Sequence, residues 1–309
     1  MTTKKVLIAT KKPFAESARN TMVQMFKEAG LEPVVLEKYE DPGELLSAVS
    51  DVAAMVIRSD KVTEEVLDAA KELKLVVRAG AGYDNVDCEA AKSRGVIVEN
   101  TPGQNANAVA ELTIGLMVMM ARGKYSGKPG TELRGKKLGV HAYGNIGKIV
   151  ASLAKGFGME VCAFDPFIDR CVFDENGVEC MSCREDLYAC CDYVSLHIPA
   201  TPETVQSINY DILSRMKESA TLINTARAEV IHEEDLLRIM EERPGFKYAS
   251  DIAPKNADIL LEKFPDRVFF TPKKMGAQTL EANTNAGLAA AQQVIDYLKE
   301  GKILNRVNP

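Results

Sequence analysis

The chain has 309 residues, 46% of them hydrophobic, and a formal net charge of −6. This length and composition favour two α/β domains, and the negative balance excludes a diffuse basic surface for nucleic acid. The most apolar helix candidate, residues 109–121, is too short to cross a bilayer, and residues 1–10 carry no cleavable signal pattern. We therefore expect a cytoplasmic protein that binds neither nucleic acid nor membrane.

Short β-branched runs alternate with amphipathic segments in the first third of the chain. This alternation is typical of a parallel sheet covered by helices on both faces. Strands are expected at 4–10, 32–38, 53–59, 73–80 and 96–101, and helices at 13–29, 42–49, 62–70 and 86–94.

A long helix is predicted over 105–122, followed by a Gly/Pro/Lys-rich loop. The alternation then resumes, with strands expected at 136–142, 161–166, 192–199, 220–226, 248–253 and 268–272, and a last helix at 281–299. The pattern predicts the α/β class with two doubly wound parallel-sheet domains.

The segment from Gly139 to Pro166 has the pattern of a dinucleotide site: strand, glycine turn, helix, strand and acid. Gly144 and Gly147 would let the backbone and the helix N-terminus approach a pyrophosphate. Asp165 would accept hydrogen bonds from the ribose hydroxyls and repel a 2′-phosphate, so NAD is favoured over NADP. Ala142 stands where the first glycine of the motif belongs. The alternative is that the glycines only permit close helix packing.

Ligands of such sheets bind at the carboxyl ends of the strands. The residues that close the predicted strands are therefore expected to line a cleft: Arg58, Arg78, Gly80, Asp165, Pro199, Thr225, Arg227, Asp251 and Lys273.

Six of the seven cysteines lie between residues 162 and 191. They include Cys180-x-x-Cys183 and the adjacent Cys190 and Cys191. Zinc sites usually pair two such knuckles, and here the second is a bare CC pair. Reduced thiols and no metal are expected.

Several long, irregular runs resemble the D-isomer-specific 2-hydroxyacid dehydrogenases, and within that family the short phosphoglycerate-oxidising members. The runs are RSDKVTEEVLDAA, VVRAGAGYDNVDCEAAKSRGVIVENTPG, SLHIPATPET, LINTARAEVI and MGAQTLEA. The resemblance implies NAD-dependent oxidation of 3-phosphoglycerate to 3-phosphohydroxypyruvate, the first step of serine biosynthesis. The chain ends without room for the regulatory domains of longer members.

The resemblance also implies a domain division. A flavodoxin-like substrate domain would comprise residues 1–100 and 287–309, and a Rossmann NAD domain residues 101–286. Catalysis would take place in the cleft. A homodimer through the NAD domain is implied, with a small interface because the segment between Arg122 and Gly130 is shorter than the family's dimer arm.

The same resemblance assigns roles to single residues. Arg227 matches the arginine that holds the substrate carboxylate, a task suited to a planar fork of donors. Arg58, Ser59 and Lys61 would bind substrate and its phosphate, and Ala79, Gly80 and Asn105 would also contact substrate. The residues that would contact NAD are Tyr143, Gly144, Asn145, Ile146, Gly147, Asp165, His197, Ile198, Pro199, Thr204, Thr225, Ala226, Arg227, Asp251, Gly276 and Ala277. Alternatively, Arg58, Lys61 and Arg227 are solvated surface charges.

The chain differs from the family at the position of the catalytic acid/base residue. Members usually carry a histidine in TPHIGA and a glutamate five residues after the nicotinamide aspartate, whereas this chain has TPKKMGA and Asn256. Lys273 or Lys274 occupies the histidine position, depending on the direction of counting, with Lys273 slightly favoured. The pKa of a lysine amine is near ~10.4 in water and must be lowered for the lysine to act as a base near neutral pH. A nearby glutamate would oppose this, because its negative charge raises the pKa. A lysine at the histidine position is therefore chemically consistent with an asparagine at the glutamate position.

Two other functions stay open. One is a different enzyme of the family, acting on glyoxylate, hydroxypyruvate or D-lactate. The other is a catalytically silent NAD sensor or corepressor, which the missing histidine and glutamate would fit.

Overall fold

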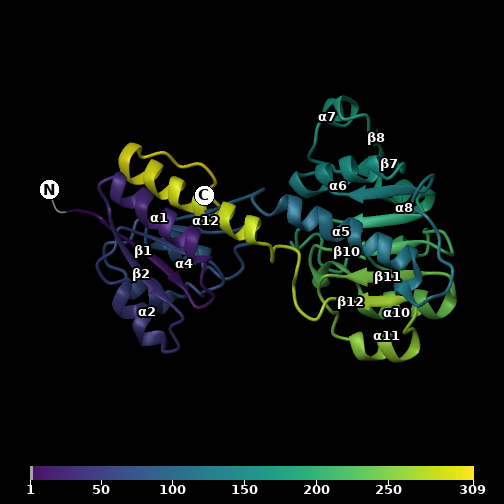
Figure 1. Cartoon of the computed structure of the whole chain (residues 1–309), viewed down its shortest axis with the longest axis horizontal. Coiled ribbons are helices and arrows are strands. Elements are labelled where there is room, and N and C mark those ends of the chain that lie inside the picture. Colours follow the sequence, from purple (N-terminus) through teal and green to yellow (C-terminus); the bar gives the residue numbers. More distant parts are fainter. Residues whose placement is uncertain (1–2) are drawn as a thin grey trace. The chain divides into compact units, whose positions relative to one another are not determined.

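The computed structural model describes residues 3–309 and divides into two compact units (Figure 1). The first unit runs to Asn105 and resumes at Thr279, and the second spans Ala106–Gln278. These limits differ from the predicted 100 and 286. The reason is the last helix, α12 (Leu280–Glu300), which is continuous and belongs as a whole to the first unit.

The first unit is a five-stranded sheet in which every pairing is parallel. The order β2-β1-β3-β4-β5 is the flavodoxin-like one. Its strands are β1 (Lys5–Thr10), β2 (Glu32–Glu37), β3 (Ala54–Ile57), β4 (Leu75–Arg78) and β5 (Ile97–Asn100). Its helices are α1 (Glu16–Glu28), α2 (Pro42–Ala48), α3 (Glu64–Ala69), α4 (Cys88–Ser93) and α12.

Helices α1 and α12 lie side by side on one face of this sheet (Figure 1). α12 buries Ala286, Ala290 and Val294 there. Gly287 permits the close approach, since a Cβ at that position would lie 3.0 Å from Met22 Sδ.

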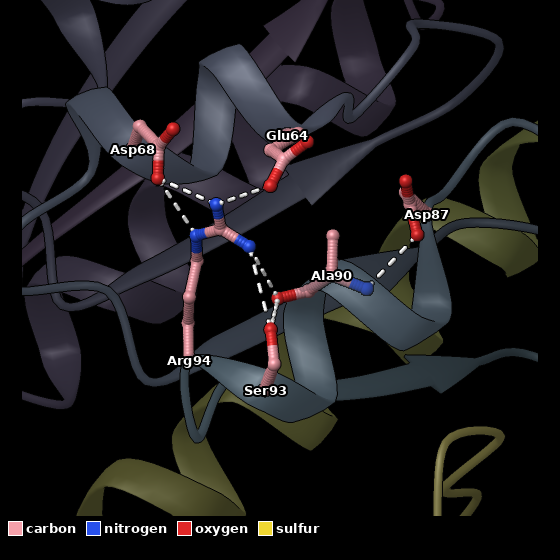
Figure 2. A network of polar contacts seen from close by, with 6 residues as sticks. All are labelled: Glu64, Asp68, Asp87, Ala90, Ser93 and Arg94. Atoms are coloured by element: carbon pink, nitrogen blue, oxygen red, sulfur yellow. Dashed lines mark hydrogen bonds and ion pairs between the residues drawn. The ribbon is translucent and has the colours of Figure 1, made fainter.

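On another part of the first unit, Arg94 ties helix α3 to helix α4 (Figure 2). Its Nη2 lies 2.9 Å from Glu64 Oε1 and its Nε donates to Asp68 Oδ1 at 2.8 Å. Asp87 caps α4 by accepting from Ala90 N at 2.9 Å. The three carboxylates are at the surface, where such pairs contribute little each.

The C-terminal segment lies along the open edge of β5. Val307 N donates to Val98 O, and the Asn308 side chain bonds Val98 N and Val96 O. The buried carboxylate of Glu99 accepts from Leu304 N at 2.7 Å. An edge strand is covered in this way.

The second unit is a seven-stranded parallel sheet with the order β12-β11-β10-β9-β6-β7-β8. Around β6 this is the Rossmann order. Its strands are β6 (Lys137–His141), β7 (Glu160–Phe164), β8 (Glu179–Cys180), β9 (Tyr193–Leu196), β10 (Thr221–Asn224), β11 (Lys247–Ser250) and β12 (Val268–Phe270). Its helices are α5 (Ala106–Ala121), α6 (Asn145–Gly156), α7 (Arg170–Glu175), α8 (Arg184–Cys190), α9 (Tyr210–Leu213), α10 (Glu233–Glu242) and α11 (Ala257–Lys263), with short 3₁₀ turns at Gly123–Tyr125 and Ala228–Val230.

Helix α5 packs on helix α6 and buries Ala110, Met117 and Met120 in the core of the second unit. Across residues 3–309, none of the helices combines the length and the apolar character needed to span a membrane. The predicted fold class, with a flavodoxin-like and a Rossmann sheet, is confirmed.

Candidate dinucleotide and catalytic site

The turn between β6 and α6 has the backbone shape of a glycine-rich phosphate loop. Ala142 adopts a φ of 78°, the left-handed conformation that favours glycine. Its N–H donates to Phe164 O at 2.9 Å, which fixes the turn against β7. Ala142 therefore keeps the conformation of the missing first glycine, at a cost of about 1–2 kcal/mol.

The two glycines of this loop serve different purposes. A Cβ at Gly147 would lie 2.2 Å from Ala142 O, so only glycine lets α6 start this close to the strand. A Cβ at Gly144, the residue before the helix, would meet open space. The first turn of α6 receives no side-chain cap. Its N–H groups and the helix dipole thus fit a pyrophosphate.

Asp165 lies at the tip of β7 and contacts the loop through its carboxylate. Oδ2 accepts from Tyr143 N at 2.8 Å, and Oδ1 accepts from Phe167 N at 2.9 Å. Each oxygen keeps one lone pair for a ribose hydroxyl. The Tyr143 side chain is fully buried and stacks on Phe173 with ring centroids 4.6 Å apart, so only its backbone borders the loop.

Two histidines of the second unit are held in the neutral form. Burial, with Arg184 nearby, lowers the pKa of His141 to about 4, and its Nδ1 lies 3.0 Å from Tyr188 Oη. Burial lowers the pKa of His197 to about 3, and its Nε2 pairs with Ser195 Oγ at 3.1 Å. Their uncharged state at neutral pH suits binding and packing.

Asp251, directly after β11, is 1% exposed and holds the segment that carries the two lysines. Oδ1 accepts from Met275 N at 2.7 Å and from Thr271 Oγ1 at 3.0 Å. Oδ2 accepts from Gly276 N at 2.8 Å. One buried carboxylate therefore holds the residues on both sides of the Lys273–Lys274 pair. Both lysines are exposed.

The turn after β10 presents Arg227. Asn224 shapes it, because its Oδ1 accepts from Ala226 N at 2.9 Å and its Nδ2 donates to Arg227 O at 2.8 Å. The half-buried Arg227 donates from Nη1 to Ala226 O at 3.1 Å. Thr225 is buried and lies 3.0 Å from Thr113 of α5, Oγ1 to Oγ1.

The loop after β9 is closed by a threonine. Thr204 Oγ1 donates to Pro199 O at 2.5 Å and accepts from Thr201 N at 2.7 Å. Ile198 is buried at the start of this loop. Asn256, at the family's glutamate position, donates from Nδ2 to Glu233 O at 3.1 Å, and its Oδ1 is buried without a partner among the described residues.

In the first unit, Arg58 follows β3 and serves its own fold. Nη1 donates to Lys12 O at 3.0 Å and to Pro13 O at 2.9 Å, and Nη2 bonds Asn283 Oδ1. Its guanidinium lies 5.2 Å from the centre of the Phe14 ring. Burial lowers the pKa of Arg58 and Asp60 opposes this, so the side chain keeps its charge.

The other predicted substrate residues follow the carboxyl ends of strands in the same sheet. Ser59 and Lys61 are exposed, Ala79 is buried, and Asn105 is half-buried. Gly80 has a φ of 145°, and a Cβ there would lie 1.6 Å from Arg78 Nη1, so the Arg78 guanidinium covers this turn. Within each sheet, the polar residues expected at the carboxyl ends of strands are found there.

Three contributors escaped the sequence analysis: Thr271, Ser195 and Thr113. Each acts through a hydrogen bond to a site residue. Ser195 lies in β9 two residues before His197, a spacing that could have indicated it. Thr271 and Thr113 have no comparable sequence signal.

A Rossmann sheet with a glycine-bounded helix start and an acid at the tip of the second strand defines a dinucleotide-binding α/β protein. Comparison with known proteins gives the family. Residues 109–273 match the model of the D-isomer specific 2-hydroxyacid dehydrogenase, NAD binding domain. The chain belongs to this family, and the predicted NAD cofactor is confirmed.

Similar proteins include phosphoglycerate dehydrogenases and a hydroxypyruvate reductase. D-3-phosphoglycerate dehydrogenase of Methanocaldococcus jannaschii is 38% identical over 283 residues, which are 86% of this chain and 53% of the relative. The chain thus spans about half the length of the phosphoglycerate dehydrogenases it matches first. Hydroxypyruvate reductase of Thermotoga maritima is 35% identical over 90% of this chain and 94% of the relative.

A solved structure covers the chain completely. The NAD+-bound 3-phosphoglycerate dehydrogenase of Entamoeba histolytica has a TM-score of 0.91 and 40% identity, over 100% of this chain and 99% of that one.

Proposed function

We propose that the protein is an NAD-dependent dehydrogenase that oxidises 3-phosphoglycerate to 3-phosphohydroxypyruvate. The observation that carries this proposal is the likeness to phosphoglycerate dehydrogenases in sequence and, over the full chain, in structure. The phosphate loop and the acid at the tip of β7 support the cofactor part. When bound, NAD accepts a hydride from C2 of the substrate.

In the second unit, Arg227 would anchor the substrate carboxylate with its planar fork of donors. Lys273 or Lys274 would accept the proton of the C2 hydroxyl as general base. The buried Asp251 supports this role, because it fixes the backbone on both sides of the pair. For the cofactor, we propose contacts from the loop backbone at Tyr143–Gly147, from Asp165 and from the turns at 197–204, 225–227 and 276–277.

In the first unit, the phosphate end of the substrate would be bound by the segment from Arg58 to Lys61. A phosphate needs cationic and hydroxyl donors, and this segment offers both. Lys61 and Ser59 are exposed, whereas three donors of Arg58 already serve the fold. Lys61 would therefore act by direct charge, and Arg58 partly by shaping the turn.

A second candidate activity is hydroxypyruvate reduction, favoured by the relative from Thermotoga maritima that matches at nearly full length. The two activities differ at the phosphate end of the substrate. The cytoplasmic location and the homodimer remain predictions, and sedimentation velocity tests the latter.

The deciding experiment measures NADH formation with 3-phosphoglycerate and with unphosphorylated D-glycerate. We expect kcat/KM to be at least about tenfold higher for the phosphorylated substrate, about 1.4 kcal/mol. Equal kcat/KM values for the two substrates would favour the second activity. Faster consumption of NADH with hydroxypyruvate than with 3-phosphohydroxypyruvate would favour it as well. No turnover with any of these substrates would support an NAD sensor.

A further inference from the structure

Three cysteines of the second unit form a compact cluster. Cys162 lies in the middle of β7, Cys190 is the last residue of α8, and Cys191 follows it. The three Sγ atoms lie within 4.8 Å of one another. Cys162 Sγ is 3.3 Å from Cys191 Sγ, which is 3.6 Å from Cys190 Sγ. The Cys180-x-x-Cys183 pair, which looked the more metal-like in sequence, is not part of this cluster.

A glycine gives the cluster its room. Gly139 of β6 is the register partner of Cys162 in β7. A Cβ on Gly139 would lie 2.9 Å from Cys191 Sγ, so any larger residue would displace the thiol. Cys162 and Cys191 are fully buried, while Cys190 is half-buried and gives the cluster an opening towards solvent.

The donor set selects the kind of ligand. In the described part of the chain the cluster contains three sulfur atoms and no histidine or carboxylate. Soft thiolates select Cu(I), zinc and iron–sulfur clusters among biological metals. Structural zinc takes four protein ligands and catalytic zinc takes three plus a water. This cluster offers three sulfurs, two of them on fully buried residues.

The spacing agrees with a three-coordinate ion. Three sulfurs about 2.3 Å from an ion in their plane lie about 4 Å apart. The sulfur distances here run from 3.3 Å to at most 4.8 Å. We propose that Cys162, Cys190 and Cys191 form a binding site for one thiophilic, three-coordinate cation, and that this cation is Cu(I).

Binding is a proton exchange without electron transfer. Each S–H gives up its proton, three S–Cu bonds form, and copper remains monovalent. Cys162 Sγ lies 3.3 Å from Cys191 Sγ, where either thiol can donate, and 3.7 Å from Leu138 O, so the thiol protons are held by contacts that an ion would replace. Lys137 lies on the neighbouring strand β6, and its Nζ is paired with Glu179 Oε2 at 2.7 Å.

The test titrates the reduced, full-length protein anaerobically with Cu(I) against a chromophoric Cu(I) chelator. We expect one tightly bound equivalent, three Cu–S bonds in X-ray absorption, and protection of the half-buried Cys190 from alkylation. Cys162→Ser and Cys190→Ser are each expected to weaken binding by more than the 10–100-fold typical of outer-shell changes. Zn(II) is expected to bind more weakly than Cu(I).

Cys171→Ser and Cys183→Ser are the matched controls, since these cysteines lie outside the cluster, and both should bind as the wild type does. Because Cys162 is in the core, Cys190→Ser at the half-buried position keeps the test valid if Cys162→Ser unfolds. A wild-type affinity in Cys190→Ser, or alkylation of Cys190 undiminished by Cu(I), would overturn the proposal.

Discussion

Gly276 donates its backbone N–H to Oδ2 of Asp251 at 2.8 Å, and the absence of a side chain makes this contact possible. A Cβ on Gly276 would lie 2.9 Å from the same oxygen. Glycine at position 276 is therefore required by the buried carboxylate of Asp251. Met275 N and Thr271 Oγ1 complete the contact on Oδ1.

A first prediction concerns this carboxylate. Thr271→Val removes a hydroxyl that lies 2.7 Å from Asp251 O and 3.0 Å from Asp251 Oδ1. A hydrogen bond contributes about 0.5–1.5 kcal/mol to a neutral acceptor and about 1.5–3 kcal/mol to a charged one. We expect lower stability in urea unfolding, faster hydrogen exchange at Met275 and Gly276, and reduced kcat. Thr271→Ser keeps the hydroxyl and should restore all three. If Thr271→Val left exchange at these amides unchanged, Thr271 would not hold the segment.

A second prediction concerns the base. One of Lys273→Ala and Lys274→Ala should lose roughly 10²-fold or more in kcat, as removal of a general base does. The other should lose little, and Lys273 is favoured because it follows Pro272 directly. Lys255→Ala, an exposed lysine outside the motif, is the control. Near-normal turnover in the double variant would show that the base lies elsewhere.

The same proposal predicts the pH profile of substrate oxidation. Because a neutral amine is the base, kcat/KM should keep rising towards alkaline pH. A profile that levels off near about 6.5 would indicate a histidine instead. The depressed pKa values of His141 and His197 argue against either as the group that titrates there.

A third prediction concerns cofactor choice. The Asp165 carboxylate has room for ribose hydroxyls and repels a 2′-phosphate, so we expect at least a tenfold preference for NAD, about 1.4 kcal/mol. The measurement is kcat/KM with NAD and with NADP. Equal values would remove Asp165 from the ribose site.

A fourth prediction concerns the phosphate end. Lys61→Ala removes an exposed cation and should raise KM for 3-phosphoglycerate by roughly 10-fold or more, given about 1.5–3 kcal/mol per charge-assisted bond. NAD affinity and stability should not change. Arg58→Ala should raise this KM and also lower stability, because Arg58 bonds the Lys12 and Pro13 carbonyls. Wild-type KM in both variants would favour the unphosphorylated substrates.

A fifth prediction concerns stability against pH. Burial lowers the pKa of His141 from 6.5 to about 4, so the unfolded chain binds a proton that the folded one rejects between these values. Stability is present above pH 6.5 and is lost as pH falls towards 4, by about 3 kcal/mol at most. Urea unfolding at pH 7, 5.5 and 4.5 measures it. His141→Gln should show a shallower loss, and an equal slope would assign the effect to other groups.

Much of the fold could be predicted because strand and helix periodicities are local. The two-residue strand β8 is too short to leave such a signal. Helix α1 starts at Glu16 and not at Pro13, because the Pro13 carbonyl accepts from Arg58 and the Phe14 ring packs under the same guanidinium. That limit is set by a residue 45 positions away.

In the candidate site, too, the local features could be predicted and the contacts between residues far apart in the sequence could not. Gly144, Gly147 and Asp165 belong to one continuous motif, and their spacing predicted their positions. The contact of Thr271 with Asp251 joins residues 20 positions apart, and the thiol cluster joins Cys162 to Cys191 over 29. Neither has a fixed spacing. The first depends on how β11 and β12 are aligned, and the second on how the end of α8 packs on β7.

The proposed ribose contact of Asp165, together with its two backbone hydrogen bonds, limits any redesign of cofactor specificity. A single substitution by a small neutral residue would admit a 2′-phosphate, but it would also leave the Tyr143 and Phe167 amides without their acceptor. The loop that approaches the pyrophosphate would loosen at the same time as the ribose pocket opened. An NADP-dependent variant of this protein therefore needs at least two coordinated changes, one for the new charge and one for the orphaned amides.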